Sequence, residues 1–261
     1  MKSLPVFRCS RGPRARSLAS FSLIELLVSI AVLTLLLAIL SSFLISINST
    51  WAQGKSTINN FAKARSSLDI MTLDYQLGVF RPDVPAFTSG SNTFYTLRQS
   101  SSTYTDPTRS LICYQVQTTA TNSVLQRAAN TVTTIPFNTS TIPAANNYLN
   151  MVDGVLSMQL SFVTPTGAIT NAYAAGDKAV AVDLAIVDDT TLAVLVSTGK
   201  LATLSGDAAF NVNINGGKTP YQTWQANFNH TTGAANPINY ANYPANIRGG
   251  VQFFERYVPL P

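Results

Sequence analysis

The chain has 261 residues, and only 11% of them are charged, well below the ~25% that is usual in a soluble domain. Its formal net charge is +5, but five of its 17 basic residues lie before residue 21, where there is no acidic residue. The other 12 basic residues are balanced by 12 acidic ones, so the excess positive charge belongs to the N-terminus and does not indicate nucleic-acid binding.

Residues 1–20 form a basic leader, and residues 21–47 form an almost unbroken apolar run. Roughly 20 apolar residues can cross the hydrocarbon core of a bilayer as a helix, so we expect a transmembrane helix over 21–47. A secretory signal peptide is the alternative, but its apolar region is normally only about 7–15 residues long. The basic leader should stay in the cytoplasm, which predicts a single-pass protein of the cytoplasmic (inner) membrane with an extracytoplasmic C-terminal domain.

Glu25 is the only ionisable side chain in this apolar run. An acid at the centre of a membrane helix costs roughly 2.5–3.5 kcal/mol. The cost is lower near the start of the helix, where the interface is close and the helix dipole favours negative charge. Glu25 therefore has two interpretations: it lies at the level of the lipid headgroups, or it pairs with a positive group inside the hydrocarbon.

The order of these features resembles the N-terminal motif of type IV pilins and type II secretion pseudopilins. It consists of a basic leader, then Phe-Ser-Leu-Ile-Glu-Leu-Leu-Val over 21–28, then a long apolar helix. The resemblance implies that a prepilin peptidase cleaves between Ser20 and Phe21 and methylates the new amine of Phe21. It also implies that Glu25, the fifth residue after the cut, pairs with the N-terminus of a neighbouring pilin-like subunit during assembly. One departure is Ser20, which stands where the family usually has glycine.

Two weaker similarities lie further along the chain. The segments 125–127, 153–155 and 254–256 resemble minor pseudopilins of the J type. The segment 51–65 and the ending 257–260 resemble the Verru_Chthon cassette family of prepilin-like proteins. Both similarities imply a minor subunit of a pilin-like assembly.

The helix is expected to continue beyond the membrane as an amphipathic segment over 48–78. Steps of four and three residues connect a stripe that includes three weak positions, namely Ile47, Trp51, Gly54, Ile58, Phe61, Arg65, Leu68, Thr72 and Tyr75. Gly78 and Pro82 predict the end of a helix that spans about 23–77. The stripe is expected to pack on the chain's own sheet, and a coiled-coil seam is the alternative.

The extracytoplasmic domain, residues 79–261, is predicted to be rich in β-strands. The expected strands are 94–97, 111–117, 155–163, 180–187, 192–196 and 251–257. Asp188 and Asp189 suggest a turn that joins 180–187 and 192–196 in a hairpin. Short helices are expected at 200–204 and 221–228, and exposed loops at 130–149 and 229–250. The predicted fold class is therefore α+β, with the long N-terminal helix packed on an antiparallel β-sheet.

The sequence offers no convincing catalytic constellation. Its single histidine, His230, lies in an Asn-rich stretch and is expected to be solvated. The residues Gly216-Gly217-Lys218-Thr219 do not form a phosphate-binding loop, because Val212 replaces the first glycine of that motif. We expect no catalytic residue, no cofactor and no small-molecule substrate.

Two further groups of residues have structural interpretations. Asp183, Asp188 and Asp189 do not have the spacing of a calcium-binding loop, so no metal site is expected. Cys113 lies in an apolar run, and its only possible intrachain partner, Cys9, belongs to the leader. Cys113 is therefore expected to be a small core residue.

These observations favour a structural subunit that is processed by prepilin peptidase and assembled into a pilus or a secretion pseudopilus. Its expected partners are the peptidase, other pilin-like subunits and membrane lipid, with no nucleic acid. The alternative is a permanently anchored binding module whose loops at 130–149 and 229–250 recognise an exported substrate or a surface. A third possibility, an exported enzyme, would require a pocket with convergent titratable groups, for which the sequence offers no candidate.

Overall fold

The computed structural model describes residues 22–79, 93–100, 108–132, 147–210, 217–231 and 234–260. The chain divides into two compact units, Met1–Ala52 and Gln53–Pro261. We refer to them as unit 1 and unit 2. Ser20 and Phe21, the residues at the expected cleavage point, lie outside the described part of the chain.

The first element is the long helix α1, Leu23–Gln76, which confirms the helix expected over about 23–77. No proline interrupts the sequence of this helix, and its first turn carries Glu25. The helix gives way to Gly78, where a Cβ atom would lie only 2.4 Å from Oγ1 of Thr96. Glycine therefore ends the helix where the chain passes close to a strand of unit 2.

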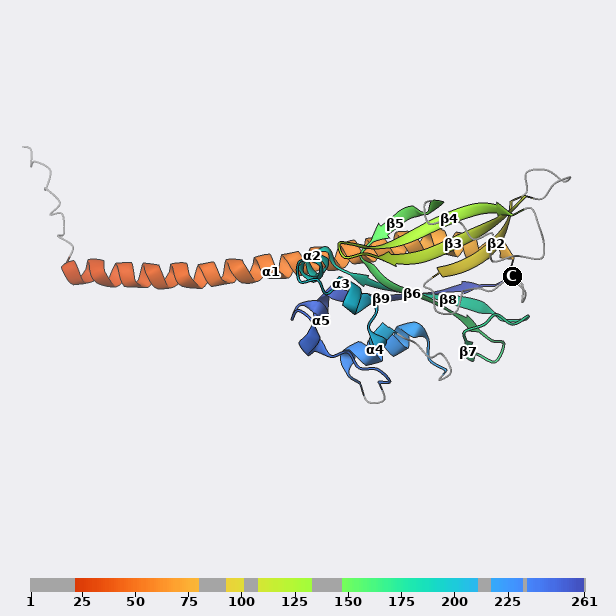
Figure 1. Cartoon of the computed structure of the whole chain (residues 1–261). Helices are drawn as coiled ribbons and strands as arrows, with labels where there is room; N and C mark the ends of the chain where they lie inside the picture. Colours follow the sequence, from red (N-terminus) through yellow and green to blue (C-terminus); the bar gives the residue numbers. More distant parts are fainter. Residues whose placement is uncertain are drawn as a thin grey trace, which may run out of the picture. The chain divides into compact units, whose positions relative to one another are not determined.

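The described strands form two antiparallel sheets in unit 2 (Figure 1). Sheet A has the order β1-β2-β3-β4-β5, and sheet B has the order β7-β6-β8-β9. The strands of sheet A are β1 (Gly78–Val79), β2 (Thr93–Ser100), β3 (Thr108–Thr118), β4 (Ser123–Val132) and β5 (Leu149–Asp153). The strands of sheet B are β6 (Val155–Val163), β7 (Ile169–Thr170), β8 (Ala179–Val187) and β9 (Val251–Pro259). The α+β class expected from the sequence is confirmed.

The expected strands at 94–97, 111–117, 155–163, 180–187 and 251–257 lie within β2, β3, β6, β8 and β9. The loop expected at 130–149 was wrong at both ends, because β4 extends to Val132 and β5 begins at Leu149. Residues 133–146 of that expected loop lie outside the described part of the chain.

The strand expected at 192–196 was wrong, since these residues belong to helix α2, Asp189–Ser197. Asp188 is the N-cap of α2 rather than part of a hairpin turn: its Oδ1 accepts a hydrogen bond from the Thr191 backbone N–H at 2.9 Å. Leu195 is buried, and Leu192 and Val196 are partly buried against the same cluster. That spacing of three and four residues suits one face of a helix, and it outweighs the strand preference of the valines.

A single residue, Gly154, connects sheet A to sheet B between β5 and β6. Its φ is +83°, and a Cβ atom at this position would lie 2.7 Å from the carbonyl oxygen of Val187. Its N–H donates to the Ser123 carbonyl at 2.7 Å, and its carbonyl accepts from the Val187 N–H at 2.8 Å. Gly154 thus joins both sheets through its own backbone, in a conformation and a space that suit only glycine.

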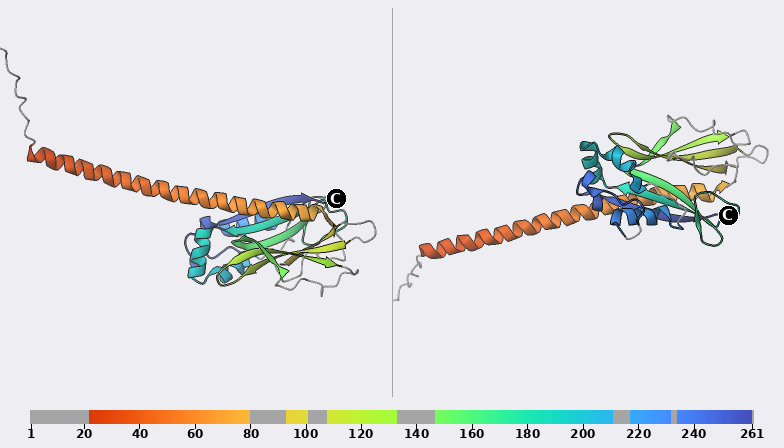
Figure 2. Two further views of the ribbon diagram at one scale, coloured as in Figure 1. Left: turned by 90° about the horizontal axis from the view of Figure 1, so that it is seen from above. Right: turned by 60° about the horizontal axis from the view of Figure 1, so that its bottom comes forward.

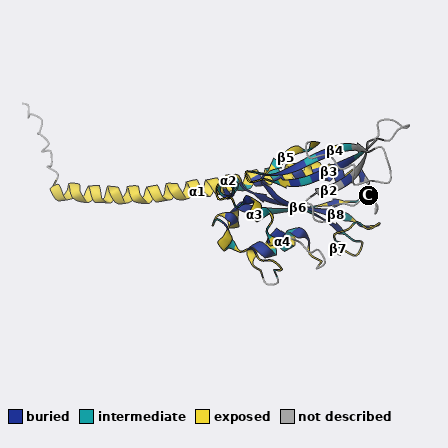
Figure 3. Cartoon of the chain, in the orientation of Figure 1, coloured by how far each residue is buried: buried dark blue, intermediate teal, exposed yellow. Residues whose placement is uncertain are grey.

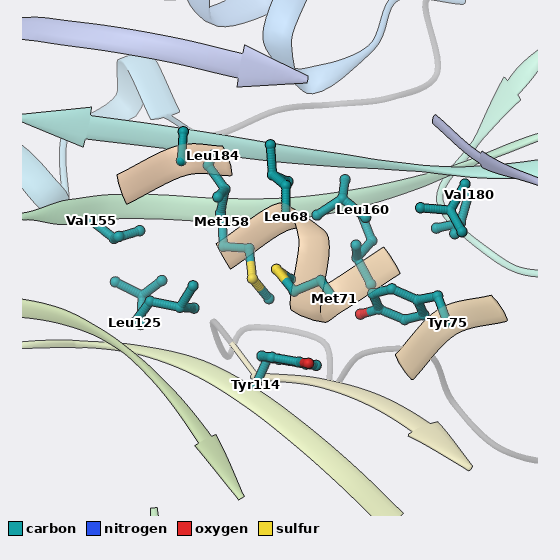
Figure 4. Close-up of a cluster of buried hydrophobic side chains, with 14 of the residues drawn as sticks. Leu68, Met71, Tyr75, Tyr114, Leu125, Val155, Met158, Leu160, Val180 and Leu184 are labelled. Atoms are coloured by element: carbon teal, nitrogen blue, oxygen red, sulfur yellow. The ribbon is translucent and has the colours of Figure 1, made fainter. Parts of the chain in front are cut away.

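The main core of unit 2 lies between the two sheets and includes the C-terminal part of α1 (Figure 4). Met71 and Tyr75 of α1 are completely buried, together with Tyr114 and Leu125 of sheet A and Met158 of sheet B. Figure 4 shows these side chains converging from the helix and from both sheets. Burial of this kind contributes about 1.5–3 kcal/mol for each large apolar side chain.

The stripe predicted along the helix was only partly correct. Leu68, Thr72 and Tyr75 are buried as expected, but Arg65 is exposed, and so are Ile58 and Phe61. The buried face also includes Ala64 and Met71, which the sequence predicts to widen the stripe, together with the unpredicted polar residues Asn60, Ser67 and Asp74. It contains several polar residues, so apolar periodicity alone could not locate it.

The other face of sheet B is covered by short helices, as Figures 1 and 2 show from different directions. They are α2, α3 (Leu201–Ser205), η3 (Ala208–Phe210), α4 (Pro220–Asn229), η5 (Tyr240–Asn242) and α5 (Ile247–Gly250). The helices expected at 200–204 and 221–228 correspond to α3 and α4. The exposed loop expected at 229–250 was wrong in part, because Ile238, Tyr243 and Ile247 are buried beside Trp224.

Candidate functional site

Unit 1 exposes an apolar helical surface. Every residue of α1 from Leu23 to Ala52 is exposed, and most of them before Ile47 are large and apolar (Figure 3). α1 is the one helix of the described chain that is long and apolar enough to cross a membrane, judged by length and composition. An apolar surface of this size is rare on a soluble monomer and indicates contact with lipid or with other apolar helices.

Glu25 lies in the first turn of this helix, and its side chain is exposed. Its backbone N–H donates to the Ser22 carbonyl at 3.0 Å, and its carbonyl accepts from the Ser29 hydroxyl at 2.7 Å. The backbone around Glu25 is therefore satisfied within the helix. The exposed carboxylate makes no hydrogen bond or ion pair with a described residue, so a group from lipid or from another chain can reach it, and its place near the helix N-terminus favours negative charge.

Within unit 2, a buried polar cluster fixes the C-terminal part of α1 to sheet A. Arg127 donates from Nε to Oδ2 of Asp74 at 2.8 Å and from Nη2 to Oδ1 at 3.1 Å. Tyr114 also donates its hydroxyl hydrogen to Asp74, whose side chain is only 3% exposed. Burial, followed by the hydrogen bond to Asp74, raises the pKa of Tyr114, so its hydroxyl remains a donor.

Two ion pairs fix the same part of α1 at other points of unit 2. Lys63 contacts Asp189 of α2 at 2.5 Å, and Arg256 of β9 contacts Asp69. Both pairs are partly exposed, so each contributes at most about 1 kcal/mol. They orient the helix more than they stabilise it.

α1 also leaves apolar residues uncovered within unit 2. Ile58 is 69% exposed and Leu73 is 58% exposed, and Ile70 is exposed as well. The side of α1 that carries these three residues points away from the buried face and is exposed. Exposed apolar residues on one side of a helix are typical of contact with a further partner.

His230 and Cys113 are both held by contacts within unit 2. His230 ends α4 with φ of +53°, its Nε2 lies 2.7 Å from the Ile238 carbonyl oxygen, and its ring stacks on Tyr240. Cys113 is completely buried, and burial raises its pKa to about 12. The expectation that Cys113 is a core residue is confirmed. His230 is exposed, as expected, and these two contacts also hold its ring in place.

Asp183 lies in the middle of β8 and is completely buried. Neither of its carboxylate oxygens makes a well-formed hydrogen bond with a residue that the structure describes, although the Tyr221 backbone and the Glu255 carboxyl interact with it. Glu255 lies opposite it on β9. Burial, and then repulsion by Glu255, raise the pKa of Asp183 well above its usual value. This pair could not be predicted from the sequence, because the register of two distant strands brings the residues together.

Metal and phosphate chemistry find no support within the described ranges. No group of three or more His, Cys, Asp or Glu side chains could hold a metal ion there. Thr219, the last residue of the glycine-containing segment at 216–219, caps α4: its Oγ1 accepts from the Gln222 N–H at 3.3 Å. Of the residues predicted to act in processing and assembly, only Glu25 lies in the described part of the chain, on the exposed apolar helix.

Comparison of the sequence with models of known protein families finds no match, and a search of curated proteins finds no significant relative.

Proposed function

We propose that this protein is a minor pilin-like or pseudopilin-like structural subunit, anchored in the cytoplasmic membrane and assembled with other subunits through its N-terminal helix. The observation that carries the proposal is Glu25, the one acid in the apolar run 21–47, on a helix that is exposed from Leu23 to Ala52. The α+β unit that follows the helix is consistent with this layout. No enzymatic activity is part of the proposal.

In the proposed mechanism, prepilin peptidase removes residues 1–20 and methylates the amine of Phe21. The apolar helix then leaves the bilayer and packs against helices of neighbouring subunits. Glu25 forms an ion pair with a neighbour's positively charged N-terminal amine, which offsets part of the cost of a carboxylate in apolar surroundings. The exposed apolar residues Ile70 and Leu73 extend this contact between subunits beyond the membrane.

The first experiment is co-expression of the full chain with a prepilin peptidase, followed by intact-mass measurement and N-terminal sequencing of the membrane fraction. We expect a product that begins at Phe21 and carries one methyl group. Ser20→Gly should raise the cleaved fraction, because glycine is the usual residue of the family at this position. An intact Met1 in both variants would favour the permanently anchored binding module instead.

The second experiment measures incorporation into filaments or detergent-resistant oligomers. Glu25→Ala should leave membrane insertion unchanged and abolish incorporation, whereas Ser29→Ala, one turn further along the same exposed helix, should assemble normally. Normal assembly of Glu25→Ala would refute the charge pairing. Recovery of the full-length protein only from the soluble fraction would refute membrane anchoring itself.

A further inference from the structure

Strand β9 forms one edge of sheet B. It pairs with β8 along its whole length, and no other described strand pairs with it. The strand has nine residues, and its only proline is at the last position, Pro259. An edge strand of this length offers alternate N–H and C=O groups to a further strand.

A pocket of about 280 Å³ lies beside the first half of this edge. Four consecutive residues of β9, 251–254, line it. Successive side chains of a strand point to opposite faces of the sheet, so one pocket can touch all four only from beside the strand. The pocket and the free edge therefore belong to one surface.

Two pairs of aromatic rings flank the pocket. Phe254 packs edge-to-face on Phe61 of α1, with ring centres 5.2 Å apart. Phe253 packs in the same way on Phe228 of α4, with ring centres 5.0 Å apart. All four residues line the pocket, which gives it aromatic walls on both sides of the strand.

Among the residues that the structure describes, Arg248 of α5 is the only charged one that lines the pocket. Its guanidinium carbon lies 4.4 Å from the centre of the Tyr240 ring, and it forms no ion pair within the part of the chain that the structure describes. Gln252 also lines the pocket, and its buried Oε1 has no hydrogen-bond partner among those residues. An anion could pair with Arg248, and an N–H donor could satisfy Gln252.

We propose that an extended segment of a partner protein adds to the free edge of β9, with a large apolar side chain in this pocket and a carboxylate beside Arg248. The pocket is smaller than the roughly 300–1,000 Å³ of typical small-molecule sites, and it suits one or two side chains. Main-chain hydrogen bonds to β9 supply affinity, and the aromatic walls and Arg248 supply specificity. The inference does not depend on the pilin-like assembly of α1.

The test uses the full chain in lipid nanodiscs and a phage library of random heptapeptides, after subtraction on empty nanodiscs. We expect enrichment of peptides in which an acidic residue neighbours an aromatic or large aliphatic one. The best peptide is then synthesised with a fluorophore, and its affinity is measured by anisotropy. Hydrogen exchange with the bound peptide should slow at the amides of β9.

Arg248→Gln should weaken the peptide about tenfold or more, because it removes a charge-assisted contact. Lys178→Gln removes an exposed cation away from the pocket and should leave the affinity unchanged. Gln225→Trp, at an exposed lining residue, should block binding by filling the pocket, even if Arg248→Gln disturbs α5. The same peptide with a central proline should bind weakly, since it cannot complete the strand.

A library that yields no enriched peptide would overturn the proposal. So would an enriched peptide that binds Arg248→Gln as tightly as the unmodified protein, or one that protects amides elsewhere than in β9. Peptide binding with failed subunit assembly would retain this proposal and refute the assembly function. Normal subunit assembly without peptide binding would retain the assembly function and refute this proposal.

Discussion

Arg127 on β4 holds Asp74 on α1 through two parallel hydrogen bonds, with Asp74 almost fully buried and Arg127 about one-quarter exposed. This pair connects the helix to sheet A across 53 positions of the sequence. It is a strong type of contact, because the fork of the guanidinium matches both carboxylate oxygens.

Arg127→Met should destabilise unit 2 by about 3 kcal/mol or more, because the buried Asp74 carboxylate would lose its cation. Denaturant unfolding followed by the fluorescence of Trp224, which is buried in unit 2, measures this change. The double variant Asp74→Asn with Arg127→Met should recover part of the loss. A single variant as stable as the unmodified protein would show that the pair contributes nothing.

Gly154→Ala and Gly167→Ala make a matched comparison, since both glycines have φ of +83°. The left-handed conformation alone costs a non-glycine residue about 1–2 kcal/mol. At Gly167 a Cβ atom meets nothing within 4 Å, whereas at Gly154 it lies 2.7 Å from the Val187 carbonyl oxygen. We expect Gly154→Ala to lower the midpoint of thermal unfolding much more than Gly167→Ala. Equal losses would contradict the close contact.

Asp183→Asn should stabilise unit 2 at neutral pH. The pKa of Asp183 is raised in the folded state above its ordinary value of 3.8, so folding favours the protonated carboxyl. Protonated Asp183 contributes fully to the free energy of unfolding below pH 3.8, and this contribution is lost as pH rises through the pKa of the folded state. The charged carboxylate therefore lowers stability at neutral pH. Glu255 and Tyr257 are the titratable groups that face it from β9.

Unfolding measured across pH tests this prediction. The advantage of Asp183→Asn should shrink as pH falls toward 3.8. Asp153→Asn, at an exposed carboxylate, is the control and should show no comparable gain at neutral pH. An Asp183→Asn protein that is less stable than the unmodified one at neutral pH would mean that the carboxylate has a stabilising role.

Met71→Ala and Leu73→Ala separate the two faces of α1. Met71 is completely buried between the sheets, so its truncation should cost about 2–5 kcal/mol. Leu73 is 58% exposed, and its truncation should change the free energy of unfolding by less than about 0.5 kcal/mol. Urea unfolding of both variants provides the measurement, and a large loss for Leu73→Ala would show that its face is covered.

The sequence located those elements whose signal is local. The strands at 155–163 and 180–187 are runs of apolar and β-branched residues, and both lie in the centre of sheet B. The long helix was also evident, because it has no proline and begins with an apolar run that only Glu25 interrupts with a charge. Such signals depend on residues that are neighbours in the chain.

Some errors occurred where distant residues decide the structure, whereas helix α2 was missed although its cap at Asp188 and its spacing of three and four residues are local. Asp74 is a polar residue on the buried face of α1, and it is tolerated there only because Arg127 and Tyr114 reach it from sheet A. Phe61 fits the apolar stripe, yet it packs on Phe254 at the outer edge of β9. At the candidate assembly site, Glu25 could be identified from the sequence, whereas the pocket beside Arg248 depends on four separate segments of the chain.

The one-residue connection at Gly154 also restricts folding errors. Because no slack separates β5 from β6, a slip of one position in sheet A would be carried directly into sheet B. Met158, Leu160 and Phe162 would then turn away from the central core, and the polar residues between them would replace them there. An incorrect register in one sheet is therefore destabilised by the other sheet, and a chain with misaligned strands does not form a stable misfolded state.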